Sequence, residues 1–145
     1  MDPLSIATNV LRIITTFLGA AKDLNEIRNK WQNAPTTVLS LCAQLKLNGA
    51  LLSRLQTLLL DDTNPVHAEP PVVDALETTL ISWLALGSCL GEYVSKIMKG
   101  VQGDRSMSSK AKFWTLWNEA EVKDLLEQLH QQYSAINTLI GPLNR

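Results

Sequence analysis

A chain of 145 residues is long enough to bury a core of its own and is most simply one domain. Apolar residues make up 46% of it and charged residues 19%, a balance that excludes an intrinsically disordered chain. The formal net charge of -1 excludes a general electrostatic attraction to nucleic acid.

The first predicted element is one long helix that runs from Pro3 to about Trp31. Asp2 is a good N-cap residue and proline suits the first helical position, whereas Pro35 cannot continue the helix. The apolar residues of this helix form two stripes at helical spacing. The first stripe is Leu4, Ala7, Leu11, Ile14, Leu18 and Ala21, and the second is Ile6, Val10, Ile13, Phe17, Ala20, Leu24, Ile27 and Trp31.

Together the two stripes cover roughly 220° of the helix at about 3.6 residues per turn. The surface helix of a globular protein needs an apolar arc of only about 100°. Either this helix is a central element that other helices surround, or it works in two environments. Its polar residues make it a poor permanent membrane span, so we expect a soluble resting state. These polar residues are Thr8, Asn9, Arg12, Thr15 and Thr16.

The middle of the chain predicts two further long helices separated by a loop. The second helix runs from Pro35 to Leu60, and a loop rich in proline follows from Asp61 to Pro71. The third helix runs from Val72 to Lys99, with Gly100 as its C-cap. The glycines of Gly87–Gly91 match the small-xxx-small pattern. This pattern either lets a neighbouring helix approach closely in the core or marks a membrane dimer.

The last part of the chain predicts a short helical turn and a fourth long helix. The aromatic turn lies at Phe113–Trp117. Asn118 and Glu121 have the form of a capping box, so we expect the helix to break at Asn118. The last helix then runs to Ile140, where Gly141-Pro142 stops it. No segment alternates as a strand does.

The predicted fold class is all-α: an up-down four-helix bundle with one short extra helix before the last long helix. Short connections favour antiparallel neighbours among consecutive long helices. The central apolar stripes predict the core as Leu11, Ile14, Leu18, Leu45, Leu80, Trp83, Leu90, Leu129 and Ile136.

No group of residues in the sequence has the composition of a catalytic site. His67 and His130 have no cysteine, histidine or acidic neighbours at metal-ligand spacing. Phosphate-binding and nucleophile motifs are also missing. We therefore expect neither an enzyme nor a metal or cofactor site. Cys42 and Cys89 lie in apolar helical patterns, which favours buried free thiols over a disulfide.

Charge is distributed unevenly along the chain. Five acids and no base lie between residues 61 and 77, and five bases lie between 96 and 112 against Asp104 alone. The bases are Lys96, Lys99, Arg105, Lys110 and Lys112. They either complement a helix dipole and solvate a loop, or form a basic patch for anionic lipid or an acidic partner. An up-down bundle places them at the end of Arg28 and Lys30, away from the apolar start of the first helix. Both regions can engage one membrane only if that helix moves.

Two segments resemble the HeLo-like domain of fungal proteins. The opening MDPLSIATNVLRIITTF resembles the start of that domain, and WNEAEVKDLLEQLHQQYSAINTLI, from Trp117, resembles its last helix. The resemblance covers essentially residues 1–145. It implies the N-terminal effector domain of a longer STAND or NLR-like protein, followed by nucleotide-binding or repeat regions. Such domains are similar to the four-helix bundle of mixed-lineage kinase-like proteins.

The resemblance also implies a function in regulated cell death, fungal immunity and heterokaryon incompatibility. Some relatives kill cells by releasing the first helix into a membrane on oligomerisation. The expected membrane or partner residues are Leu4, Ile6, Val10, Ile13, Phe17 and Ala20. The domain would be cytoplasmic at rest, would associate with itself when activated and would move to the plasma membrane without binding nucleic acid. The alternative is a helical interaction or oligomerisation module with no membrane activity.

Overall fold

The computed structural model describes residues 3–30, 34–61, 70–102 and 113–141, and these residues are helical, without any strand. They form four long helices and a short helical turn at 113–116. The long helices are α1 (Pro3–Lys30), α2 (Thr36–Leu60), α3 (Pro70–Gln102) and α5 (Glu119–Ile140). The predicted all-α class is therefore confirmed.

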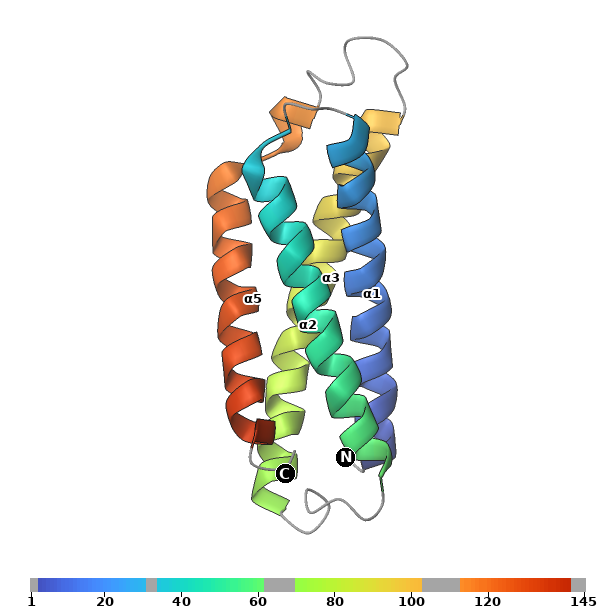
Figure 1. Cartoon of the computed structure of the whole chain (residues 1–145), viewed down its shortest axis with the longest axis vertical. Coiled ribbons are helices and arrows are strands. Elements are labelled where there is room, and N and C mark those ends of the chain that lie inside the picture. The colour runs from blue at the N-terminus through green and yellow to red at the C-terminus, as the bar shows by residue number, and fades with distance from the viewer. Residues whose placement is uncertain (1–2, 31–33, 62–69, 103–112, 142–145) are drawn as a thin grey trace.

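The four long helices lie side by side, and successive ones run in opposite directions (Figure 1). α1 packs against α2 and α3, and α5 packs against the same two helices. As a result, α1 and α5 stand at opposite corners of the assembly. The expectation that consecutive helices are neighbours holds for α1 with α2 and for α3 with α5. It is wrong for α2 and α3, which also stand at opposite corners.

One hydrophobic core runs the length of the four helices. Most of the predicted core residues are buried in it: Ile14, Leu45, Leu80, Trp83, Leu90, Leu129 and Ile136. The prediction is wrong for Leu11 and Leu18, which are 51% and 49% exposed. The second stripe of α1, from Ile6 to Ile27, faces the core together with Ala7, Ile14 and Ala21 of the first stripe. A corner helix can bury only the arc that faces its two neighbours, so one edge of a 220° arc must stay outside.

Both ends of α3 differ from the prediction. The helix begins at Pro70 rather than Val72, because proline is tolerated in the first turn, where its missing N–H has no helical partner. It also continues past Gly100 to Gln102, so Gly100 is not its C-cap. A Cβ at Gly100 would lie 2.6 Å from Leu116 Cδ1. The glycine therefore gives room to the short helical turn that follows α3.

The two glycines in the middle of α3 form the contact with α1. A Cβ at Gly87 would lie 3.4 Å from Phe17 Cε1, and one at Gly91 would lie 3.5 Å from Thr16 Cγ2. Both glycines therefore face α1 within the bundle, where an added Cβ would make ordinary van der Waals contact, and Phe17 beside Gly87 is fully buried. This placement agrees with the interpretation as a helix contact in the core.

Polar groups inside the core are few among the described residues. Asn48 is fully buried, and its Nδ2 donates to the Gln44 carbonyl oxygen at 2.8 Å. Its Oδ1 and the Trp83 Nε1 have no hydrogen-bond partner. Cys42 is buried and its Sγ lies 3.4 Å from the Ala21 carbonyl oxygen, as expected of a core thiol. Cys89 is exposed, so the prediction of a buried thiol is wrong there.

Candidate functional site

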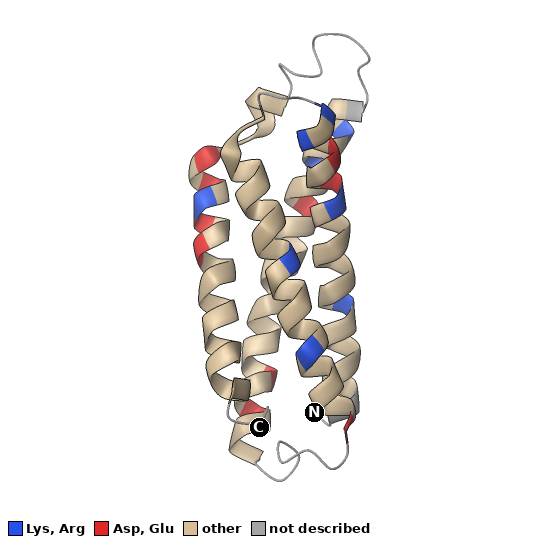
Figure 2. Cartoon of the chain, in the orientation of Figure 1, with Lys and Arg blue, Asp and Glu red and all other residues tan. Residues whose placement is uncertain are grey.

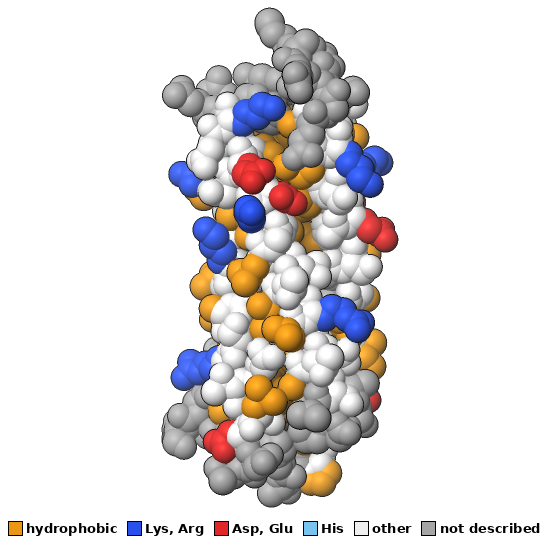
Figure 3. Space-filling model, turned by 90° about the vertical axis from the view of Figure 1, so that its right-hand side faces the viewer, with side chains coloured by type: hydrophobic (Ala, Val, Ile, Leu, Met, Phe, Trp, Pro, Cys, Tyr) orange, Lys and Arg blue, Asp and Glu red, His pale blue; other side chains and the backbone are white. Residues whose placement is uncertain are grey.

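The outer side of α1 carries two exposed leucines among polar residues. Leu11 and Leu18 are seven residues apart, so they lie on the same face about two turns from each other. Both are about half exposed. Figure 3, which looks onto this side of the molecule, shows apolar side chains in a line between well-separated cations. Packing against α2 and α3 accounts for most of the apolar arc of α1, and Leu11 and Leu18 are the exposed remainder among its described side chains.

The inner face of α1 holds the residues that were predicted to contact a membrane or partner. Their exposed fractions lie between 0% and 5%, and they are Ile6, Val10, Ile13, Phe17 and Ala20. The side chain of Leu4 lies outside the described part of the structure. In this state the inner face is therefore core, and it could meet another surface only if α1 left α2 and α3.

Two threonines of α1, Thr15 on its outer side and Thr16 beside α3, direct their hydroxyl groups back into the helix. Thr15 Oγ1 donates to the Leu11 carbonyl oxygen at 2.9 Å, and Thr16 Oγ1 donates to the Arg12 carbonyl oxygen at 3.1 Å. A hydroxyl bonded within its own helix costs less to transfer into an apolar environment than one that needs water. These two residues therefore oppose membrane contact less than their polar residue type suggests.

By length and composition alone, α3 is the one described helix that is apolar enough to cross a membrane, over Pro70–Val101. α1 does not meet that criterion. A core helix can meet it too, and α3 buries Leu76, Trp83 and Leu90 against the other helices.

An aromatic corner fastens the start of α5 to α2. The Trp117 Nε1 donates to Thr37 Oγ1 and to Glu119 Oε1, each at 3.1 Å. The Thr37 hydroxyl donates to the same carboxylate oxygen at 2.8 Å. The Phe113 ring stacks on Trp117 with its centroid 5.4 Å away. These contacts join α2, the turn at 113–116 and α5 across about eighty residues of sequence.

Tyr93 joins the same corner to α3. Its hydroxyl donates to the Leu116 carbonyl oxygen at 3.3 Å and accepts from the Asn118 N–H at 2.9 Å. Burial raises the pKa of the Tyr93 phenol, and the carboxylates of Glu121 and Glu119 raise it further, while the Asn118 hydrogen bond lowers it. The phenol thus stays protonated and can hold both backbone groups.

Asn118 is the N-cap of α5, as the sequence predicts. Its Oδ1 accepts from the Glu121 N–H at 3.1 Å, and its backbone is extended, which breaks the helix between the turn and α5. Asn118→Ala should therefore lower the free energy of unfolding by about 0.5–2 kcal/mol. Asn118→Asp keeps a side-chain hydrogen-bond acceptor, so its free energy of unfolding should fall by less. Urea denaturation of the two variants checks this prediction. An aspartate variant that is less stable than the alanine variant would contradict it.

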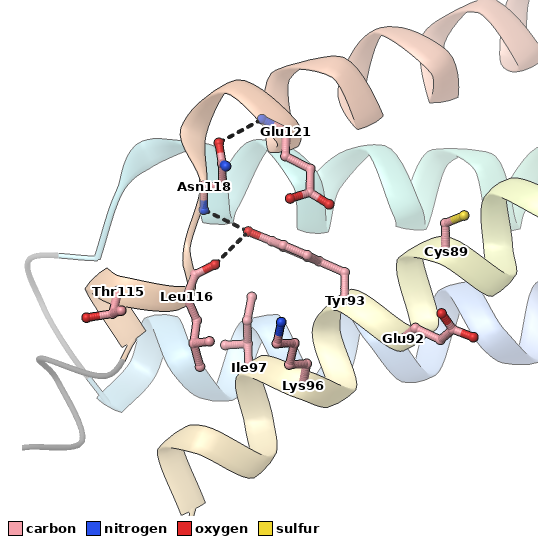
Figure 4. Close-up of a pocket in the computed structure, with 9 residues that line it drawn as sticks. All are labelled: Cys89, Glu92, Tyr93, Lys96, Ile97, Thr115, Leu116, Asn118 and Glu121. Atoms are coloured by element: carbon pink, nitrogen blue, oxygen red, sulfur yellow. Dashed lines mark hydrogen bonds between the residues drawn. The ribbon is translucent and has the colours of Figure 1, made fainter.

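A groove of about 490 Å³ lies where α3 meets the turn and α5 (Figure 4). Its lining carries both signs of charge, with Glu92 and Lys96 from α3 and Glu121 from α5. The turn places Leu116 and Asn118 over Tyr93 and so forms one wall. Sequence reasoning did not find this groove, because its walls are more than twenty residues apart and no motif links them.

Only part of the predicted basic patch lies among the described residues. Lys96 and Lys99 are exposed on α3, whereas Arg105, Lys110 and Lys112 lie outside the described part. Lys96 shares the groove with two carboxylates, so this surface is of mixed charge rather than purely basic. Figure 2 shows acids and bases close together at the same end of α1. There, burial raises the pKa of Asp23, Glu26 raises it further and Lys22 lowers it.

Comparison with protein-family models, with curated proteins and with solved structures gives no match.

Proposed function

We propose that this chain is a HeLo-like N-terminal effector domain, an up-down four-helix bundle whose first helix acts at a membrane when the domain oligomerises. The observation that carries the proposal is that α1, which fills the core, also exposes two leucines at a corner of the bundle. One side fills the core with Val10 and Phe17, and the other exposes Leu11 and Leu18. The opening and closing segments of the sequence support the family assignment.

The burial of α1 sets the energetic conditions for this mechanism. Each fully buried Val, Ile or Phe side chain contributes about 1.5–3 kcal/mol by leaving water. Exposing the inner face of α1 to water would therefore cost more than a typical domain has in total stability. Lipid offers an apolar environment that replaces the core, and enforced proximity of several copies makes a joint site available. The domain would thus be cytoplasmic at rest and reach the plasma membrane on activation.

The alternative is a helical interaction or oligomerisation module that never contacts lipid. Half-exposed leucines on α2, Leu39 and Leu47, favour it, because together with those of α1 they offer apolar contacts to a protein partner. In both cases the partners are other copies of the domain or C-terminal nucleotide-binding or repeat regions of the same protein. Anionic lipid is a partner only if the domain acts at a membrane.

A substitution at one exposed leucine, Leu11, distinguishes the two proposed functions. We expect forced oligomers of the wild type to release dye from liposomes and oligomers of Leu11→Asp to release much less. A charge near the centre of an inserted helix costs at least about 2.5 kcal/mol per copy. The matched control is Leu60→Asp on α2, because Leu60 is 54% exposed and Leu11 is 51% exposed. If Leu11→Asp leaks as fast as the control, the interaction module becomes the better explanation.

A further inference from the structure

The helices at different corners of the molecule carry opposite charge. α2 has two bases, Lys46 and Arg54, and no acid anywhere in Thr36–Leu60. α5 has four acids, Glu119, Glu121, Asp124 and Glu127, against Lys123 alone. Figure 2 shows the acids gathered on the first half of α5, away from the bases of α1 and α2. Among the described residues, α2 is therefore purely basic and α5 mainly acidic.

Two lysines and one leucine gather along the seam between α1 and α2. Leu18 of α1 lies over Gly49 of α2, since a Cβ at Gly49 would be 3.4 Å from Leu18 Cδ2. Lys22 is four residues after Leu18 and Lys46 is three before Gly49, so each lies on the seam face of its helix. We call Leu18, Lys22 and Lys46 the lysine seam; all three are exposed.

Two carboxylates form an exposed face on α5. Asp124 and Glu127 are three residues apart and therefore point to the same side of the helix. The Gln128 Nε2 donates to Asp124 Oδ2 at 2.9 Å, and the Gln131 Nε2 donates to Glu127 Oε1 at 3.5 Å. These bonds hold the carboxylates along the helix and leave further lone pairs for another donor. We call Asp124 and Glu127 the acidic face.

The lysine seam and the acidic face lie at the same height, meaning the same level along the long axis of the molecule. The hydrogen bond between Thr37 and Glu119 places those two residues level, and α2 and α5 run in the same direction. Nine residues further along each helix, Lys46 comes level with Gln128, next to Glu127. Lys22 lies within about one helical turn of the same height, because α1 is antiparallel to α2 with Leu18 beside Gly49.

We propose that the acidic face of one copy docks on the lysine seam of the next copy. The two surfaces are different parts of the chain, so the contact is heterologous and repeats as a ring or a filament. Because the surfaces share one height, neighbouring copies stand side by side in the same direction. Every α1 then starts at the same end, which is the arrangement that joint membrane insertion needs. This role for the contact rests on the proposed function.

The contact is weak in the isolated chain, because exposed ion pairs contribute little and are screened by salt. It forms at the effective concentrations of about millimolar that tethering produces. Sedimentation velocity without lipid, at protein concentrations up to about 1 mM and at low and high salt, measures it directly. We expect salt-sensitive self-association of the wild type.

Charge reversal tests which surfaces meet. Lys22→Glu with Lys46→Glu should weaken self-association at least about tenfold, because like charges then face each other, and Asp124→Lys with Glu127→Lys should do the same. All four changes together restore opposite charges and the net charge of the wild type, and association should return. Arg12→Glu with Arg54→Glu alters the net charge equally but lies off the seam, and should have a smaller effect.

The proposal is overturned if the wild type does not self-associate, or if the fourfold variant stays as weak as the double ones. It is also overturned if the off-seam control weakens association as much as the seam variant. Because this measurement contains no membrane, its failure leaves the liposome result for Leu11→Asp untouched. Equally, a chain that associates through these surfaces but never permeabilises liposomes would contradict only the membrane function.

Discussion

Val10→Asp is expected to unfold the domain. Val10 is 0% exposed in the core between α1 and its neighbours, where the new carboxylate would find no partner. The effective penalty for burying an unpaired charge is several kcal/mol, and a whole domain has only about 5–15 kcal/mol of stability. Far-UV circular dichroism and a thermal melt of the purified variant check this result.

Leu11→Asp, one residue further on, should leave the domain folded. Leu11 is 51% exposed, so the new carboxylate stays in water, and substitutions at such sites usually change stability by only about 0.5 kcal/mol. The two neighbours therefore test the orientation of α1 on the other helices. If Val10→Asp melts close to the wild type and Leu11→Asp unfolds, the inner and outer faces of α1 have been assigned the wrong way round.

The orientation of α1 shows what the sequence could and could not predict. Helical spacing revealed both apolar stripes, but it did not show that Leu11 and Leu18 stay exposed while Ala7, Ile14 and Ala21 of the same stripe are buried. The sequence does contain a signal that indicates the inward side of α1. The second stripe continues through Leu24 and Ile27, where the rest of the helix is charged, whereas the first stops at Ala21. A stripe that stays apolar among charges is the one that packs against other helices.

Structural features that depend on residues close in sequence were predicted well, and features that depend on tertiary contacts were not. The break at Asn118 depends on one side chain and an amide three residues later, and both are visible in the sequence. Gly100 looks like a helix terminus, but its role depends on Leu116, which approaches it from the next element. The groove beside Tyr93 was missed for the same reason, since its hydroxyl binds a backbone group 23 residues away. The ends of α2 and α5 were predicted within a residue or so because proline and glycine mark them.

The central claim is that α1 separates from α3 when the domain acts, and a reversible crosslink between them tests it most directly. A Cβ at Gly91 would lie 3.5 Å from Thr16 Cγ2, so residues 16 and 91 face each other across the two helices, and Thr16→Cys with Gly91→Cys is the pair chosen for the disulfide. Cys89→Ser removes the exposed native thiol nearby. The oxidised variant should remain folded and should still form the enforced oligomer.

Dye release from liposomes by this locked oligomer, before and after addition of reductant, is the decisive measurement. Thr16→Cys alone and the wild type, each with and without reductant, control for the substitutions and for the reagent. We expect the oxidised oligomer to release dye at least about tenfold more slowly, with full recovery on reduction, because a covalently held α1 keeps Val10 and Phe17 in the core. Release at the same rate in the oxidised and reduced states would show that α1 does not leave α3.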